Sequence, residues 1–169
     1  MKVDTFDELV ACNALYRPGP MGIGAHEEFV KNKFKPKGIK YIHKSLKPIL
    51  SKTNGVLVFQ EQLMFIAHEI GGMTLGDGDY LRRFMGNSST LITKELEGKT
   101  LTKDEEVDYN YSNFRKYWNY FVEGAINQGY SNKDVDSLKA YLLKYLGYSF
   151  NKCLTDNHEV DTETRGKVK

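Results

Sequence analysis

Apolar residues recur at helical spacing in five segments of the chain, and a glycine or a proline ends each of them or follows it closely. A recurrence of about 3.6 residues predicts amphipathic helices that bury one face. The segments span residues 5–15, 61–70, 74–86, 114–127 and 132–146. The sequence therefore predicts a mainly α fold.

Two of these segments begin with a helix-start signal. Thr5 and Glu8 have the spacing of a capping box, and Thr74 and Asp77 resemble one. One short strand is predicted at Val56–Phe59, because an Asn-Gly turn signal precedes it. The expected fold class is mainly α with a short strand element.

The remaining segments are polar. Residues 87–111 contain serine, threonine and an acidic cluster, which predicts a surface insertion with little fixed structure. Two cysteines far apart indicate neither a disulfide framework nor a zinc site. No segment has the roughly 20 apolar residues that span a bilayer, and the first residues do not resemble a secretory signal. We expect a cytoplasmic protein without a membrane partner.

Arg17 precedes Pro18-Gly19-Pro20. A proline disfavours the helical conformation in the residue before it. The sequence therefore predicts that Arg17 is extended and is presented from a stiff, non-helical corner.

Residues 29–60 contain no Asp or Glu, and eight lysines lie between Lys31 and Lys52. Aromatic and apolar residues are interleaved among them. Such a stretch fits a surface that contacts a phosphate backbone. A solvated basic face explains the composition equally well.

Arg82 and Arg83 have two interpretations. Arginines near a helix C-terminus complement the helix dipole. Because adjacent helix positions point about 100° apart, one guanidinium could instead hold a phosphate while the other grips a neighbouring segment. The four histidines show no metal-ligand spacing, and Asp77 and Asp79 are expected to favour a helix N-terminus, so no metal site is predicted.

Four strings resemble the alpha subunit of bacterial DNA polymerase III in its DnaE-type form, a C-family polymerase. They are FDELVACNALYRPGPMG (6–22), NGVLVFQEQLMFIAHEIGGMTLGDGDYLRRFMG (54–86), FVEGAINQGY (121–130) and LLKYLGYSFNK (142–152). They occur in the family's order and extend over most of residues 5–152. The resemblance implies that residues 1–152 form the fingers region, which follows the palm.

The resemblance implies template-directed DNA synthesis by nucleotidyl transfer. Arg82 and Arg83 match the family's fingers arginines, which bind the triphosphate of the incoming dNTP. Arg17 is implied to contact nucleotide or primer–template DNA, and Lys152 is a weaker phosphate ligand. Mg²⁺ would be held by palm carboxylates outside this chain, so the chain alone is expected to be inactive. The implied partners are primer–template DNA, dNTP, the rest of the alpha subunit and the holoenzyme.

The chain departs from the family at two places. After Met85-Gly86 the family usually continues with lysines, whereas Asn87-Ser88-Ser89 follows here. The segment up to Phe121 is also longer than in the family, which supports the interpretation of residues 87–111 as an insertion.

The sequence changes character after Lys152, where Cys153 begins a polar tail that extends to residue 169. This tail resembles the start of an intein, whose first residue is commonly a cysteine that attacks the preceding carbonyl. The family's serine after FNK would suit the other splice junction. Residues 153–169 are thus expected to begin an intein, either split, with a C-terminal partner, or in a truncated frame. A frayed tail of unrelated sequence is the alternative.

A second functional hypothesis needs no polymerase. The chain could be a stand-alone helical module that binds nucleic acid without catalysis. A third would make Arg82 and Arg83 ordinary structural cations.

Overall fold

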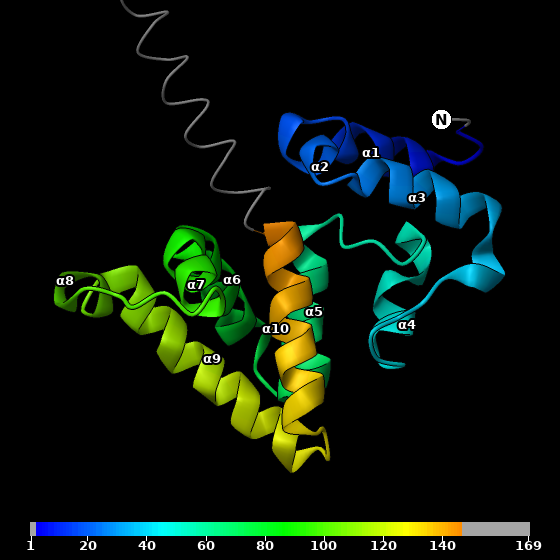
Figure 1. The fold of residues 1–169 in the computed structure, drawn as a ribbon. Helices are drawn as coiled ribbons and strands as arrows, with labels where there is room; N and C mark the ends of the chain where they lie inside the picture. The colour runs from blue at the N-terminus through cyan, green and yellow to red at the C-terminus, as the bar shows by residue number, and fades with distance from the viewer. Residues whose placement is uncertain (1–2, 147–169) are drawn as a thin grey trace, which may run out of the picture.

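The computed structural model describes residues 3–146, and every regular element within that range is a helix. In chain order the elements are α1 (Phe6–Leu15), α2 (Pro18–Gly22), α3 (Ala25–Phe34), the 3-10 helix η1 (Pro36–Gly38), α4 (Leu46–Leu50), the 3-10 helix η2 (Ser51–Thr53), α5 (Gln60–Gly71), α6 (Leu75–Asn87), α7 (Ser89–Leu96), α8 (Lys103–Glu106), α9 (Tyr109–Asn127) and α10 (Asn132–Leu146). The five predicted helices are confirmed. Figure 1 shows α1–α4 on one side of α5 and α10, and α6–α9 on the other.

The largest part of the core lies between α5, α6, α9 and α10. The apolar face predicted for residues 61–70 is completely buried. The side chains that meet in this core are Leu63, Ile66, Ala67, Ile70, Leu81, Met85, Phe114, Trp118, Phe121, Ala125, Leu138 and Leu142. α5 and α9 approach so closely that a Cβ on Gly124 would lie 1.8 Å from the carbonyl oxygen of Gly71. Only glycine allows this contact.

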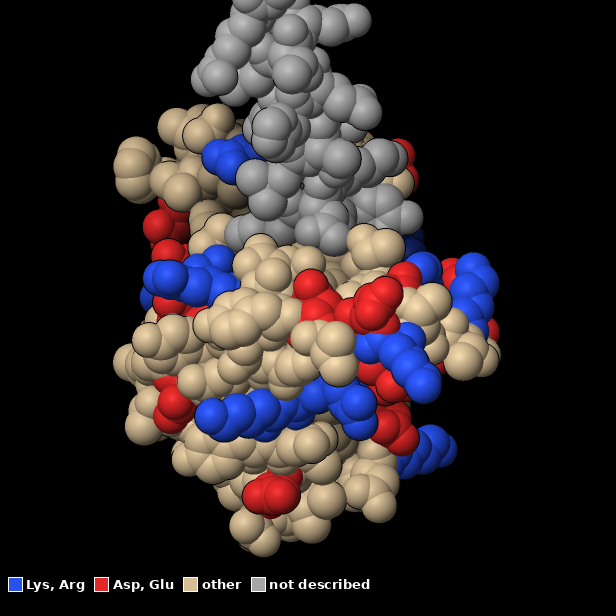
Figure 2. Space-filling model, turned by 90° about the vertical axis from the view of Figure 1, so that its left-hand side faces the viewer, with Lys and Arg blue, Asp and Glu red and all other residues tan. Residues whose placement is uncertain are grey.

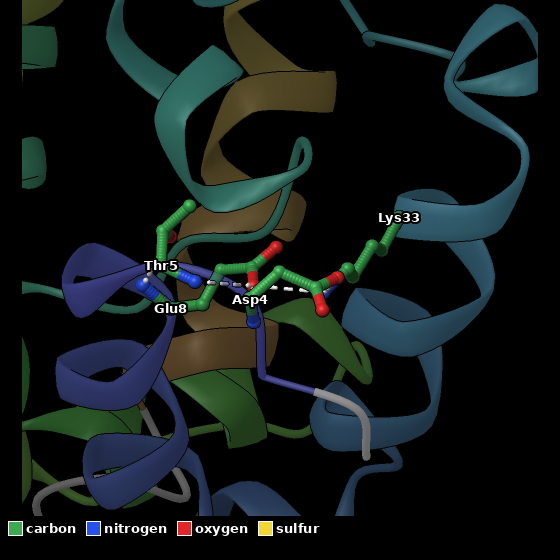
Figure 3. A network of polar contacts seen from close by, with 4 residues as sticks. All are labelled: Asp4, Thr5, Glu8 and Lys33. Carbon is green, nitrogen blue, oxygen red and sulfur yellow. Dashed lines mark hydrogen bonds and ion pairs between the residues drawn. The ribbon is translucent and has the colours of Figure 1, made fainter.

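The N-terminal helix is attached to α3 by charge. The predicted capping box is confirmed, because Thr5 Oγ1 accepts from the Glu8 amide at 3.2 Å and Glu8 Oε2 accepts from the Thr5 amide at 3.3 Å. Lys33 Nζ reaches from α3 to Asp4 Oδ2 and Glu8 Oε2, both at 2.7 Å (Figure 3). The hydrogen bond from Lys33 lowers the pKa of Glu8.

The predicted strand at Val56–Phe59 is wrong. Among the described residues there is no strand, and this segment bonds to side chains instead of to a neighbouring strand. The amides of Val58 and Phe59 both donate to Gln62 Oε1 at 2.9 Å. The carbonyl oxygen of Val56 accepts from Thr53 Oγ1 at 2.7 Å. These bonds satisfy an extended backbone without a sheet.

The expectation of little fixed structure in residues 87–111 is also wrong. α7 and α8 lie in this segment, and α9 begins in it. Ile92 and Tyr111 are buried, and the segment is held by a capping box between Thr102 and Glu105 and by an ion pair from Lys94 to Glu105. Whether the segment is an insertion relative to the family remains a prediction.

Several polar contacts join residues 28–55 to residues 130–145, among them three from tyrosine hydroxyls. The Tyr145 hydroxyl donates to Glu28 Oε2 at 3.0 Å, and the Tyr141 hydroxyl donates to the carbonyl oxygen of Gly55 at 3.3 Å. The hydroxyl oxygens of Ser45 and Tyr130 lie 2.6 Å apart. The predicted helix stop at Gly147, and Lys152, Cys153 and the tail, lie outside the described residues.

Candidate functional site

The candidate site lies on α6. Thr74 begins this helix as predicted, because its Oγ1 accepts from the Asp77 amide at 3.1 Å and donates to Asp77 Oδ2 at 2.6 Å. Asp77 therefore favours the helix N-terminus, as expected from its position in the first turn. Arg82 and Arg83 follow on the next turns.

A single carboxylate, Asp79, binds both arginines. Oδ1 accepts from Arg82 Nε at 3.0 Å and Nη2 at 2.7 Å. Oδ2 lies 2.8 Å from Arg83 Nε. The hydrogen bond from Arg82, and then the two positive charges, lower the pKa of Asp79. The three groups together carry one net positive charge at neutral pH.

The two guanidinium groups differ in exposure. The Arg82 side chain is 13% exposed, whereas the Arg83 side chain is 61% exposed. An arginine has five N–H donors, and the ion pair recorded for Arg83 uses Nε. The Nη groups of Arg83 are thus held at the surface by an anchored side chain, a geometry that suits the binding of phosphate oxygens.

The helix-dipole interpretation of these arginines is weakened by their position. α6 extends to Asn87, and its last turn contains no basic residue. The dipole effect falls off within the last turn of a helix. Dipole compensation therefore does not account for Arg82 and Arg83.

Arg17 is extended, as predicted, with φ −130° and ψ 152°. The corner that follows it is helical, which corrects the expectation of a non-helical one. Pro18 occupies the first position of α2, where the missing N–H costs no hydrogen bond. Arg17 is exposed, but it immediately precedes α2, which lies apart from α6 in Figure 1.

The structure corrects the expectation for Asp79. It was assigned to the helix N-terminus, but it instead orients the two arginines. The signal was present, because residues three and four positions apart on a helix are neighbours, and Arg82 and Arg83 stand at those distances from Asp79.

An aromatic cluster adjoins the arginines, and sequence reasoning also missed it. Tyr80 stacks on Phe84 and on Tyr117 of α9, with ring centroids 6.2 and 5.6 Å apart. Tyr109 meets the edge of Phe84 at 6.0 Å. This cluster fixes α6 against α9 and thereby positions the arginines.

Within residues 3–146, no group of three or more His, Cys, Asp and Glu side chains could hold a metal ion. His68 is a structural residue, as expected, since its Nδ1 lies 2.7 Å from the carbonyl oxygen of Met73. None of the helices in this range is long and apolar enough to cross a membrane.

The family model of the bacterial DNA polymerase III alpha subunit finger domain matches residues 1–106. DNA polymerase III subunit alpha of Saccharopolyspora erythraea is 38% identical over 157 residues, which cover 90% of this chain and 11% of that protein. The same subunit of Halalkalibacterium halodurans is 38% identical over 152 residues, which cover 90% of this chain and 12% of that protein. That of Borreliella burgdorferi is 39% identical over 151 residues, which cover 89% and 11%.

This chain spans only 11–12% of the length of these relatives. The family model and the relatives agree with each other and with the resemblance noted in the sequence. The chain belongs to the finger-domain family of the bacterial DNA polymerase III alpha subunit.

Proposed function

We propose that this chain is the part of a replicative DNA polymerase that receives the triphosphate of the incoming nucleotide. Its family membership supports this function. The observation that carries the proposal is the exposure of Arg83, whose Nε is anchored on Asp79 while 61% of the side chain remains accessible.

In this proposal Arg83 binds phosphate oxygens through its Nη groups. Arg82 contributes positive charge and holds Asp79, which orients Arg83. Arg17 contacts nucleotide or primer–template DNA, and Lys152 is a further phosphate ligand. Negative charge builds on the transferring phosphoryl group and the leaving pyrophosphate, so fixed cations lower the barrier.

Mg²⁺, when bound, would supply Lewis-acid catalysis. No group of residues described in this chain would hold it. The proposal assigns it to palm carboxylates of the rest of the alpha subunit, and it places the protein in the cytoplasm with the holoenzyme and primer–template DNA as partners.

The test is a titration of the 169-residue chain with a fluorescent dNTP. Arg83→Ala is expected to weaken binding about 10-fold or more, since a hydrogen bond to a charged group contributes about 1.5–3 kcal/mol. Arg115→Ala is the matched control, because Arg115 is exposed on α9 and lies outside the site. Equal affinities of the two variants would contradict the proposal.

The same titration addresses the alternative of a stand-alone nucleic-acid-binding module. Salt-dependent DNA binding with no response to any dNTP would favour that alternative. The chain alone is expected not to extend a primer in the presence of Mg²⁺, and extension by the purified chain would refute this part of the proposal.

We also propose that residues 153–169 begin an intein. The Cys153 thiolate would attack the Lys152 carbonyl carbon, so that a C–S bond forms, the peptide C–N bond breaks and the amine of Cys153 takes up a proton. The support for this proposal is the change of character in the sequence after Lys152, where Cys153 begins a polar segment.

The intein proposal predicts a second reading frame in the source genome. It should encode an intein C-terminal segment that ends in asparagine and is followed by Ser-His-Ala. Coexpression of that segment with this chain, followed by thiol treatment, should release a product ending at Lys152. Cys153→Ala should abolish the release, and a stable Lys152–Cys153 bond in the wild-type pair would count against an intein.

A further inference from the structure

Charge is unevenly divided along this chain. Residues 29–60 carry eight of the 24 cations and none of the 22 acidic residues, which gives this segment a charge of +8. The rest of the chain has 16 cations and 22 acidic residues, and therefore a charge of −6. The net charge of +2 hides this separation.

The structure places these lysines at the surface. Seven of the eight are exposed, namely Lys31, Lys35, Lys37, Lys40, Lys44, Lys47 and Lys52. The eighth, Lys33, is the one that binds Asp4 and Glu8. Within residues 3–146, none of these seven exposed lysines forms an ion pair. The segment forms the right-hand edge of the molecule in Figure 1, away from α7 and α8.

The backbone that carries the lysines is fixed at several points. Asn32 Nδ2 on α3 donates to the carbonyl oxygen of Asn54 at 2.7 Å, which joins the two ends of the segment. Ile39 packs so closely on the turn that a Cβ on Gly55 would lie 2.5 Å from Ile39 Cγ2. The His43 ring lies 4.7 Å from the ring of Tyr130. The lysines therefore project from a fixed frame and not from a free loop.

The face of the molecule shown in Figure 2 does not share this charge. On the face shown in Figure 2, blue and red side chains lie side by side. Outside residues 29–60, Lys139 lies 3.3 Å from Glu95 and is 14% exposed. Lys94, Lys99 and Lys144 are likewise paired with acidic side chains, as is common where charges of both signs are mixed on a surface.

The composition of residues 29–60 favours a ligand with a phosphate backbone. It contains no arginine, and its Asn32 amide is committed to Asn54, so it has few side chains suited to base recognition. Of its large apolar side chains only Phe34 and Ile42 are exposed, at 63% and 45%, and two scattered residues do not make the continuous apolar face of a membrane-binding helix. Lysine ammonium groups without other specificity bind a phosphate backbone by releasing counterions.

We propose that the seven exposed lysines of residues 31–52 form a second anion-binding surface that holds the sugar–phosphate backbone of DNA independently of its sequence. The proposal rests on the proposed function, in which DNA is a partner. It adds a surface distinct from the Asp79–Arg83 site on α6.

The test measures binding of a labelled random-sequence duplex to the 169-residue chain by fluorescence anisotropy, between about 50 and 200 mM salt. The variant is the triple substitution Lys37→Gln, Lys40→Gln and Lys44→Gln. The control is Lys99→Gln, Lys103→Gln and Lys133→Gln, which removes three exposed lysines elsewhere and lowers the net charge equally. Thermal unfolding of both variants checks that they fold; if the first melts early, Lys37→Gln and Lys44→Gln are measured singly.

The first variant is expected to lower the slope of log K against log salt by about 0.9 for each phosphate that it no longer neutralises, and to bind at least about 10-fold more weakly. The control should bind as the wild type does. Equal losses of affinity in both variants, or no DNA binding by the wild type, would overturn the proposal. Binding of dNTP is expected to be unchanged in the first variant, so this result is independent of the test of Arg83.

Discussion

The apolar stripe of α5 is buried, whereas most of the apolar stripe of α1 is exposed to solvent. Leu63, Ile66 and Ile70 on α5 are 0–1% exposed. On α1, by contrast, Phe6 is 77% exposed and Leu9 is 54% exposed. Both helices show helical spacing of apolar residues in the sequence. The spacing therefore predicts that a helix forms, but its neighbours decide whether the stripe is buried.

The two regions are also held by different forces. α5, α6, α9 and α10 share a core of aromatic and aliphatic side chains. α1 depends more on charge, through Lys33, and on the smaller buried residues Ala11 and Leu15. Substitutions of similar size should consequently lower the free energy of unfolding by very different amounts in the two regions.

The largest contrast is expected between two phenylalanines. Phe121→Ala removes a completely buried ring and should lower the free energy of unfolding by about 3–5 kcal/mol. Phe6→Ala removes an exposed ring and should cost less than about 0.5 kcal/mol. Urea denaturation of the two variants measures both values. Similar losses in the free energy of unfolding for the two variants would contradict the difference between the two regions.

A pair of glycines sharpens the same comparison. Gly124→Ala places a methyl group against the Gly71 carbonyl and should destabilise the protein by about 1–3 kcal/mol through overpacking. Gly22→Ala, at the end of α2, meets no atom within 4 Å and should be nearly neutral. The midpoints of urea unfolding report the difference. A tolerated Gly124→Ala would mean that α5 and α9 separate easily.

The junction between the regions should respond to alkaline pH. Burial raises the pKa of Tyr141 and of Tyr145. Because these folded-state pKa values exceed the ordinary value of 10.0, their contribution is complete below pH 10 and is lost as the pH rises further. The free energy of unfolding should fall above pH 10, by at most about 1.4 kcal/mol per pH unit for each tyrosine.

The control for the alkaline response is the double variant Tyr141→Phe and Tyr145→Phe. It should be less stable at pH 8 but should lose less stability between pH 10 and pH 12. If the free energy of unfolding fell equally with pH in the wild type and the variant, the alkaline response would belong to other groups.

The smallest effect is expected at Lys33. Lys33→Gln removes the cation that joins α1 to α3, so the amides of α1 should exchange faster with solvent while those of α5 remain protected. Hydrogen exchange measured by mass spectrometry gives the comparison. Lys31→Gln, two positions away and exposed, should leave α1 unchanged.

Local signals predicted the longer helices well. The capping boxes at Thr5 and the start at Thr74 lie within four residues of the groups that they satisfy, so the sequence contains the whole interaction. The strand prediction at Val56–Phe59 failed because the amides of Val58 and Phe59 bond to the Gln62 side chain and not to a neighbouring strand. In the polar segment, Thr102 and Glu105 have the spacing of a capping box, a signal that the prediction from composition did not use.

Contacts between distant residues could not be predicted in this way. Glu28 and Tyr145 stand 117 positions apart, and no periodicity relates them. At the candidate site, the arginines came from the resemblance, whereas their unequal exposure depends on how α6 packs in three dimensions. The spacing of Asp79 was visible, but its role followed only from the geometry.

The contact between Gly71 and Gly124 has a consequence for motion. Helices that touch backbone to backbone cannot slide past each other without first separating, so α5 and α9 move together. α6 is coupled to the same pair, because a Cβ on Gly78 would lie 3.2 Å from the Met64 carbonyl oxygen of α5. A backbone motion that moves Arg83 toward or away from a ligand is therefore expected to move α5, α6 and α9 together as one rigid body.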